Sequence, residues 1–285
     1  MKKYSEGIMQ MVFLLSATVS VLAVLLICFF LFSEGLPAMG EIGVIQFLGG
    51  RVWKPLEGRF GIFPMIVGSI YVTAGAILIG VPLGLFCAVF MAKFCPKKLY
   101  RVFKPAIELM AGIPSIVYGF FGLVVIVPIM QQVTGGSGKG ILTASILLGI
   151  MVLPTIISVS EAALRAVPET YYEGSLALGA THERSVFFAC LPAAGSGIMA
   201  GVVLGIGRAI GETMAVVMIA GNQPVVPGSI LSGVRTMTAN IVLEMGYASD
   251  LGLHRPALIA TAVVLFVFIL IINLSFSMLK RRGKG

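Results

Sequence analysis

The chain has 285 residues, of which 58% are hydrophobic and only 11% are charged, and its mean hydropathy is +1.03. A soluble globular domain carries charge on about a quarter of its residues, so this composition excludes that class and predicts an integral membrane protein. The net charge of +8 would suggest nucleic acid in a soluble chain, but here the basic residues cluster at the ends of apolar segments, as membrane topology requires.

Six apolar stretches are long enough to cross the bilayer, whose hydrocarbon core of about 30 Å takes about 20 helical residues. The first has the basic start of a signal peptide, but its apolar run continues to Phe32, which favours a retained span. We expect one all-α transmembrane domain over residues 1–285. Its spans are predicted near residues 9–33, 63–92, 105–130, 141–160, 197–221 and 256–279.

Lysine and arginine in short loops mark the cytoplasmic side of a membrane protein. Both termini, and the polar stretch between spans four and five, are therefore expected in the cytoplasm. On the other side, residues 33–62 could form a cap and residues 222–255 could include a re-entrant or interfacial segment. The basic residues that set this orientation are Lys2, Lys3, Lys93, Lys97, Lys98, Arg101, Lys104, Arg165, Arg184, Lys280, Arg281, Arg282 and Lys284.

The polar stretch at residues 161–192 has the pattern of a helix, a glycine elbow and a second helix. Pro168 suits the first turn of a helix, and Gly179 can supply the left-handed residue that ends it. Thr181 can cap the second helix, which Pro192 is expected to close. On these residues alone two interpretations stay open: a knob that another protein grips, or an amphipathic loop on the lipid headgroups.

Arg208 and Glu212 are ionisable residues inside the fifth span, and such residues are costly in a bilayer. They are four residues apart and share a helix face with Gly201 and Gly205, so this face should point towards a neighbouring helix. Arg208 lies about 15 Å into the span at 1.5 Å per residue. Because an arginine fork fits an oxyanion, we predict that Arg208, Glu212 and the adjoining Thr213 belong to a substrate pathway. The alternative is a self-neutralising pair that only locks helix packing.

Glu108 and Ser115 give a weaker signal at the start of the third span. Gly112 and Pro114 lie between them, and such residues loosen a transmembrane helix and often line a hinge or a cavity. Glu108 and Ser115 are therefore either gating or pathway residues, or structural ones.

The glycine-rich loop at residues 134–141 resembles a phosphate-binding P-loop but lacks its essential residues. Val133 and Gly140 stand where the motif needs glycine and a hydroxyl residue, so we expect no ATP site in this chain. The two histidines are unpaired and the four cysteines form no C-x-x-C pair. We therefore expect no metal site, no disulfide framework and no cofactor bound by this chain.

Residues 173–192, EGSLALGATHERSVFFACLP, resemble the cytoplasmic signature of ABC-transporter permeases, which is EAA, three residues, Gly, nine residues, Ile, one residue and Leu-Pro. Small residues replace the two alanines, and Ala189 replaces the isoleucine. The resemblance implies a six-helix permease of the MetI-like type, in which this segment is the coupling helix that docks on an ATP-hydrolysing subunit. The implied coupling residues are Glu173, Gly174, Ser175, Gly179, Ala180, Leu191 and Pro192.

Five further stretches look like the phosphate-specific permease subunits of the PstC type: WKP at 53–55, FGIFP at 60–64, IELMAGIPSIVYGFFG at 107–122, EAALRAVPE at 161–169 and GRAIGETMAVVMIAGN at 207–222. This resemblance implies a non-catalytic subunit in a bacterial or archaeal plasma (inner) membrane that forms half of a pore with a PstA-like permease. A PstB-like ATPase dimer would bind ATP and Mg²⁺, and a PstS-like external protein would deliver inorganic phosphate.

Three other functions stay open at this stage, one of which is a purely structural or assembly role in the membrane. The same kind of permease could carry another oxyanion, such as sulfate or molybdate. A secondary transporter could instead move an anion with protons through Glu212 and Glu108 without any ATPase.

Overall fold

A computed structural model describes residues 2–248 and 252–282 of the chain. Residues 1, 249–251 and 283–285 of the predicted domain, Lys284 among them, lie outside the described residues. The described elements are α1 (Lys2–Ile42), α2 (Val44–Gly49), β1 (Trp53–Lys54), η1 (Pro55–Glu57), β2 (Arg59–Phe60), α3 (Phe63–Val89), η2 (Phe90–Phe94), α4 (Lys97–Gly112), α5 (Ser115–Phe121), η3 (Gly122–Ile126), α6 (Val127–Thr134), α7 (Ile141–Arg165), α8 (Glu169–Ala177), α9 (His182–Ser185), η4 (Val186–Cys190), α10 (Leu191–Ala193), α11 (Gly195–Gly211), α12 (Met214–Ile219), α13 (Met237–Met245) and α14 (His254–Arg282).

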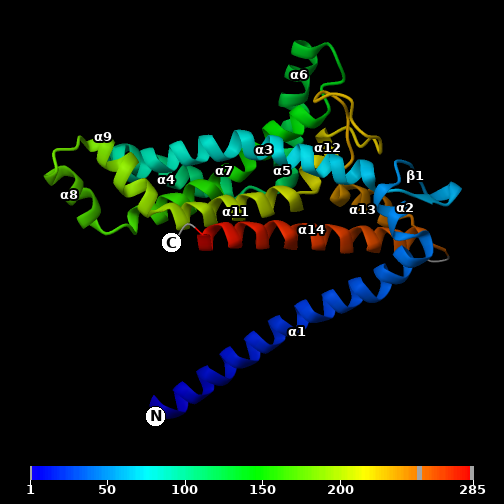
Figure 1. The fold of residues 1–285 in the computed structure, drawn as a ribbon, viewed down its shortest axis with the longest axis horizontal. Coiled ribbons are helices and arrows are strands. Elements are labelled where there is room, and N and C mark those ends of the chain that lie inside the picture. Colours follow the sequence, from blue (N-terminus) through cyan, green and yellow to red (C-terminus); the bar gives the residue numbers. More distant parts are fainter. Residues whose placement is uncertain (1, 249–251, 283–285) are drawn as a thin grey trace.

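Four long helices, α3, α7, α11 and α14, run side by side along the long axis of the molecule (Figure 1). Helix α7 is the central one, because it packs against both α3 and α11 and contributes Leu147, Met151 and Ile156, among others, to the largest buried cluster of the described residues. Helices α8 and α9 lie at one end of this bundle, and α2, β1 and α13 lie towards the other. The predicted all-α membrane architecture is confirmed.

The membrane spans agree with the sequence in number but not in continuity. Within the described residues, five helical stretches are long and apolar enough to cross a membrane: Met9–Ile42, Phe63–Phe94, Ser115–Thr134, Ile141–Arg165 and His254–Ser275. A sixth candidate is the pair His182–Ala193 and Gly195–Gly211, which is bent by 69°. The predicted spans 105–130 and 197–221 are both interrupted, the first at residues 113–114 and the second at residues 212–213.

Helix α1 diverges from the bundle and contacts α14 only near its own carboxyl-terminal part (Figure 1). Phe32 packs edge-on against Phe266 of α14, with ring centroids 5.9 Å apart. After α1 and α2, the chain forms a two-stranded antiparallel hairpin in which Trp53 pairs with Phe60 and Lys54 with Arg59. Trp53 and Phe60 are buried, so the region from 33 to 62 does cover one end of the bundle.

The third span breaks at Ile113 and Pro114, where a continuous helix was predicted over 105–130. A residue before proline avoids the helical region, and Ile113 accordingly has ψ 126°. The Tyr118 hydroxyl donates a 2.9 Å hydrogen bond to the carbonyl of Met110, which has lost its helical partner at the break. Helices α5 and α6 then point away from the axis of the bundle (Figure 1).

Candidate functional site

Arg208 lies in the last turn of α11 and reaches across to α7. Its Nη1 donates a 3.2 Å hydrogen bond to Oγ1 of Thr155, and both residues are half-buried. The glycine stripe of α11 explains this reach, because a Cβ on Gly205 would lie 2.9 Å from Cγ1 of Ile156 and a Cβ on Gly201 would meet Val159. The prediction that the stripe faces a neighbouring helix is confirmed, and that helix is α7.

The prediction that Arg208 and Glu212 form a pair on one helix face is wrong. Helix α11 ends at Gly211, and Glu212 is extended with ψ 128°. The Glu212 carboxylate accepts hydrogen bonds from the backbone N–H groups of Thr213 (3.1 Å) and Ala215 (3.2 Å), so it caps the start of α12. Arg208 and Glu212 thus have separate partners within the described structure.

A segment distant in the sequence forms a hydrogen bond with the backbone at the break after Gly211. Helix α13 presents Thr238, whose hydroxyl donates a 3.2 Å hydrogen bond to the carbonyl of Glu212. A backbone carbonyl that leaves its helix inside a membrane needs such a partner, because lipid offers none. Residues 222–248 are accordingly packed into the bundle through α13, where Met237, Ala239 and Asn240 are buried.

The segments that follow the two breaks, α5 and α12, pack against each other. A Cβ on Gly119 of α5 would lie 2.9 Å from the Cα of Ala215 in α12, so the second halves of the two spans are in close contact. Ser115 begins α5 and is half-buried. Glu108 is different: it is exposed on the surface of α4, 3.9 Å from Lys104 Nζ.

The helix, elbow and helix pattern of residues 161–192 is present. Pro168 is the N-cap of α8, Gly179 has a left-handed φ of 83°, and the Thr181 side chain accepts from the N–H of Arg184 at the start of α9. The second helical stretch, His182–Ala193, ends one residue after Pro192, as expected. The chain bends only after Ala193, before α11.

Most of the predicted coupling residues lie at the end of the bundle and surround the elbow. Glu173, Gly174 and Ser175 are in α8, whereas Leu191 and Pro192 are in α10. A hollow of about 330 Å³ lies at the elbow. It is lined by Ser175, Leu178, Gly179, Ala180, Arg184, Phe188 and Ala189.

Aromatic contacts fix this segment onto the end of the second span. The Tyr172 hydroxyl is 2.7 Å from Nδ1 of His182, which ties α8 to α9 across the elbow. The His182 ring also packs edge-on against Phe94 of η2, with centroids 4.8 Å apart. Lys93 Nζ lies 5.9 Å from the centre of the Tyr172 ring. The elbow is therefore attached to η2, which continues α3.

A buried carboxylate, Glu161, joins the helix that leads into this segment to α4. It is 2% exposed and accepts hydrogen bonds from Tyr100 (2.8 Å), Lys104 (2.9 Å) and Arg165 (2.8 Å). Arg165 also donates to the carbonyl of Met91 at 3.0 Å. The hydrogen bond to Glu161 raises the pKa of Lys104 and of Tyr100.

A second buried carboxylate, Glu244, joins three segments at the opposite end. It accepts hydrogen bonds from Trp53 Nε1 (2.8 Å) and Arg235 Nη1 (2.6 Å), and its Oε2 is 2.9 Å from His254 Nε2. Arg235 also donates to Oδ1 of Asn240 at 3.1 Å. Each charge in this cluster has a partner, as burial requires.

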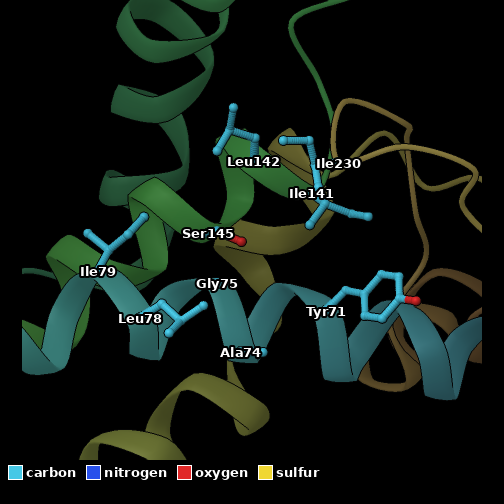
Figure 2. A pocket seen from close by; sticks show the side chains of 9 residues that line it. All are labelled: Tyr71, Ala74, Gly75, Leu78, Ile79, Ile141, Leu142, Ser145 and Ile230. Atoms are coloured by element: carbon cyan, nitrogen blue, oxygen red, sulfur yellow. The ribbon is translucent and has the colours of Figure 1, made fainter.

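The largest hollow described here is apolar and lies away from these residues. It has a volume of about 410 Å³ between α3, the start of α7 and Ile230 (Figure 2). Apart from Ser145 and Tyr71 its lining is aliphatic, and the Ser145 hydroxyl already donates to the carbonyl of Val72 at 3.3 Å. Such a surface suits hydrocarbon and does not suit an anion.

Sequence reasoning missed Thr155, Glu161 and Glu244. Thr155 follows Pro154 in an apolar run, where a hydroxyl is a weak signal of function. Glu244 follows the apolar run 230–243, and an isolated acid there could have been noticed. The partners of Glu161 on α4 are 57 and 61 residues away, so no local pattern points to them.

Comparison with known proteins places the fold and the family. The probable ABC transporter permease protein YqgH of Bacillus subtilis (strain 168) is 39% identical over 93% of this chain and 88% of its own length. The phosphate transport system permease protein PstC of Mesorhizobium japonicum is 35% identical over 85% of this chain and 80% of its own. A structure of the MetNI methionine ABC transporter in an inward facing conformation covers 81% of this chain and 99% of its own, with a TM-score of 0.60 and 21% identity.

The fold is that of the membrane subunits of ABC transporters, with several helices long and apolar enough to cross a membrane. The family model described as the binding-protein-dependent transport system inner membrane component matches residues 80–284, and the chain belongs to this family. Permeases of this class work together with ATP-hydrolysing and substrate-binding proteins.

Proposed function

We propose that this chain is the PstC-type permease subunit of an ATP-driven importer of inorganic phosphate. The observation that carries the proposal is the similarity, over most of the chain, to several permeases named as PstC of phosphate transport systems. The subunit would pair with a PstA-like permease, a PstB-like ATPase dimer and a PstS-like external binding protein in the plasma membrane.

The elbow segment would receive the ATPase. Leu178 and Phe188 beside Gly179 are 91% and 79% exposed, and Tyr171 is 54% exposed. Exposed apolar side chains that gather at one end of a membrane protein, with Tyr171 and Leu178 outside the candidate spans, favour a protein partner. This end would face the cytoplasm, and the hairpin and α13 would face outwards.

Arg208 would meet the phosphate ion. A guanidinium has five N–H donors, and the described structure engages one of them, at Thr155. The remaining donors suit the oxygens of a tetrahedral oxyanion in charge-assisted hydrogen bonds. Glu212 would act by shaping the break at the start of α12, and Thr213 and Ser115 would lie on the same pathway.

The test is Arg208→Gln in the complete complex, reconstituted in vesicles with the external binding protein. We expect phosphate uptake to fall at least tenfold while the complex still assembles and hydrolyses ATP, because glutamine loses the charge and the fork. Unchanged uptake would remove Arg208 from the pathway. Uptake of labelled sulfate or molybdate in place of phosphate would show that the cargo is another oxyanion.

A further inference from the structure

Thr155 is the residue that the structure adds to the proposed pathway. It lies on the central helix α7, directly after Pro154, and its Oγ1 accepts the hydrogen bond from Arg208. The neighbouring Ile156 is the side chain against which Gly205 packs. The close approach of α11 and α7 at that glycine therefore brings the Arg208 guanidinium to Thr155.

The hydroxyl hydrogen of Thr155 is not used in the described part of the chain. Three other helical threonines donate to the carbonyl four residues earlier: Thr18 to Leu14 at 2.8 Å, Thr134 to Met130 at 2.7 Å and Thr261 to Ala257 at 2.8 Å. Thr155 instead presents its oxygen to Arg208. A hydroxyl in an apolar span that donates to no backbone group costs folding free energy unless another acceptor is available.

We infer that Thr155 is a second contact for the anion: its Oγ1–H donates to an oxygen of the same phosphate ion that Arg208 binds. Oγ1 can accept from Arg208 and donate to the ion at once, because a hydroxyl has one donor and two lone pairs. The ion would then lie at the edge of α7, held by a charge from α11 and a hydroxyl from α7. This inference rests on the proposed function and adds a named ligand to it.

The test compares two variants, Thr155→Val and Thr155→Ser, in the reconstituted complex. Together they distinguish the effect of the hydroxyl on uptake from the effect of the side-chain shape. Valine keeps the branched shape and removes the hydroxyl, whereas serine keeps the hydroxyl. With Thr155→Val we expect the maximal rate of phosphate uptake to fall about tenfold, while ATP hydrolysis stimulated by the loaded binding protein stays within about twofold. Thr155→Ser should retain uptake within about twofold.

A tenfold loss with Thr155→Ser as well would overturn the inference, because the hydroxyl would not be the group that matters. If Thr155→Val does not assemble, Thr155→Ala removes the same hydroxyl without adding a methyl group against Arg208, and the same loss is expected. Wild-type uptake by an assembled Thr155→Val or Thr155→Ala complex would also overturn the inference.

Arg208→Gln, measured in parallel, distinguishes this inference from the proposed function. Loss of uptake with Arg208→Gln and normal uptake with Thr155→Val would reject Thr155 as a ligand and leave the Arg208 pathway intact. Normal uptake with both variants would reject the pathway itself. If Thr155 contacts the ion itself, the double variant should transport less than Arg208→Gln alone; equal uptake by the two would mean that Thr155 only holds Arg208 in place and would overturn the inference.

Discussion

The indole of Trp53 donates a 2.8 Å hydrogen bond to the carboxylate of Glu244, which is 191 residues away in the sequence. Through this bond the hairpin after α2 is joined to α13, and Glu244 in turn contacts His254 at the start of α14. One buried carboxylate therefore fixes the end of the bundle that lies opposite the elbow.

Replacing Glu244 with alanine should destabilise the protein by about 3 kcal/mol, because the half-buried Arg235 loses its counter-charge and the buried Trp53 N–H loses its acceptor. Trp53 is the single tryptophan, so its fluorescence in the purified chain reports the unfolding directly. The control is Glu57→Ala, which removes an exposed carboxylate paired with Lys54 and should change the unfolding midpoint little. Equal midpoints for the two variants would contradict the role given to Glu244.

Gly179→Ala should weaken the binding of the ATPase. The left-handed φ of 83° costs a residue with a Cβ about 1–2 kcal/mol, although there is open space around it. Co-purification of the ATPase with the variant measures the effect.

Gly135→Ala is the matched control for Gly179→Ala. Gly135 has a similar φ of 67° and open surroundings, but it ends α6 far from the elbow. It should bear a similar strain and yet retain the ATPase. Loss of the ATPase from both variants would show that general destabilisation is responsible.

Gly205→Ala should push α11 away from α7, because the new Cβ would lie 2.9 Å from Ile156. We expect a loss of about 1–3 kcal/mol in the free energy of unfolding and a fall in uptake, since Arg208 would move away from Thr155. Gly207→Ala on the same helix meets nothing within 4 Å and should be neutral or slightly stabilising. A Gly205→Ala protein as stable as Gly207→Ala would mean that the helices do not approach as described.

Lys104→Met should destabilise the contact between α4 and α7 by about 1 kcal/mol, and by the same amount at pH 7, 8 and 9. The pKa of Lys104 is raised by its bond to Glu161, so its contribution is fully present below the ordinary lysine value of about 10.4 and is lost only above it. Thermal unfolding of the wild type and the variant at the three pH values measures this. A difference that shrinks towards pH 9 would contradict the raised pKa.

The sequence contained the signal for one of the two broken spans. Pro114 excludes a helical Ile113, and a continuous third span was predicted only because hydropathy was given more weight than this local restriction. The break at Glu212 has no such signal. It depends on Thr238, which is 26 residues away and donates to the freed carbonyl, so the predicted Arg208–Glu212 pair could not have been rejected from the local pattern.

The sequence alone determined the membrane class, the number of spans, the helix and elbow pattern around Gly179 and Thr181, and the unusual position of Arg208. These features depend on hydropathy, capping and backbone preferences, which act within about 20 neighbouring residues. Only the tertiary structure decided the partners of Arg208, Glu161 and Glu244. Most of those partners come from other segments of the chain, such as Thr155 on α7, Lys104 on α4 and Trp53 on β1, and only the packing of these segments brings the side chains together.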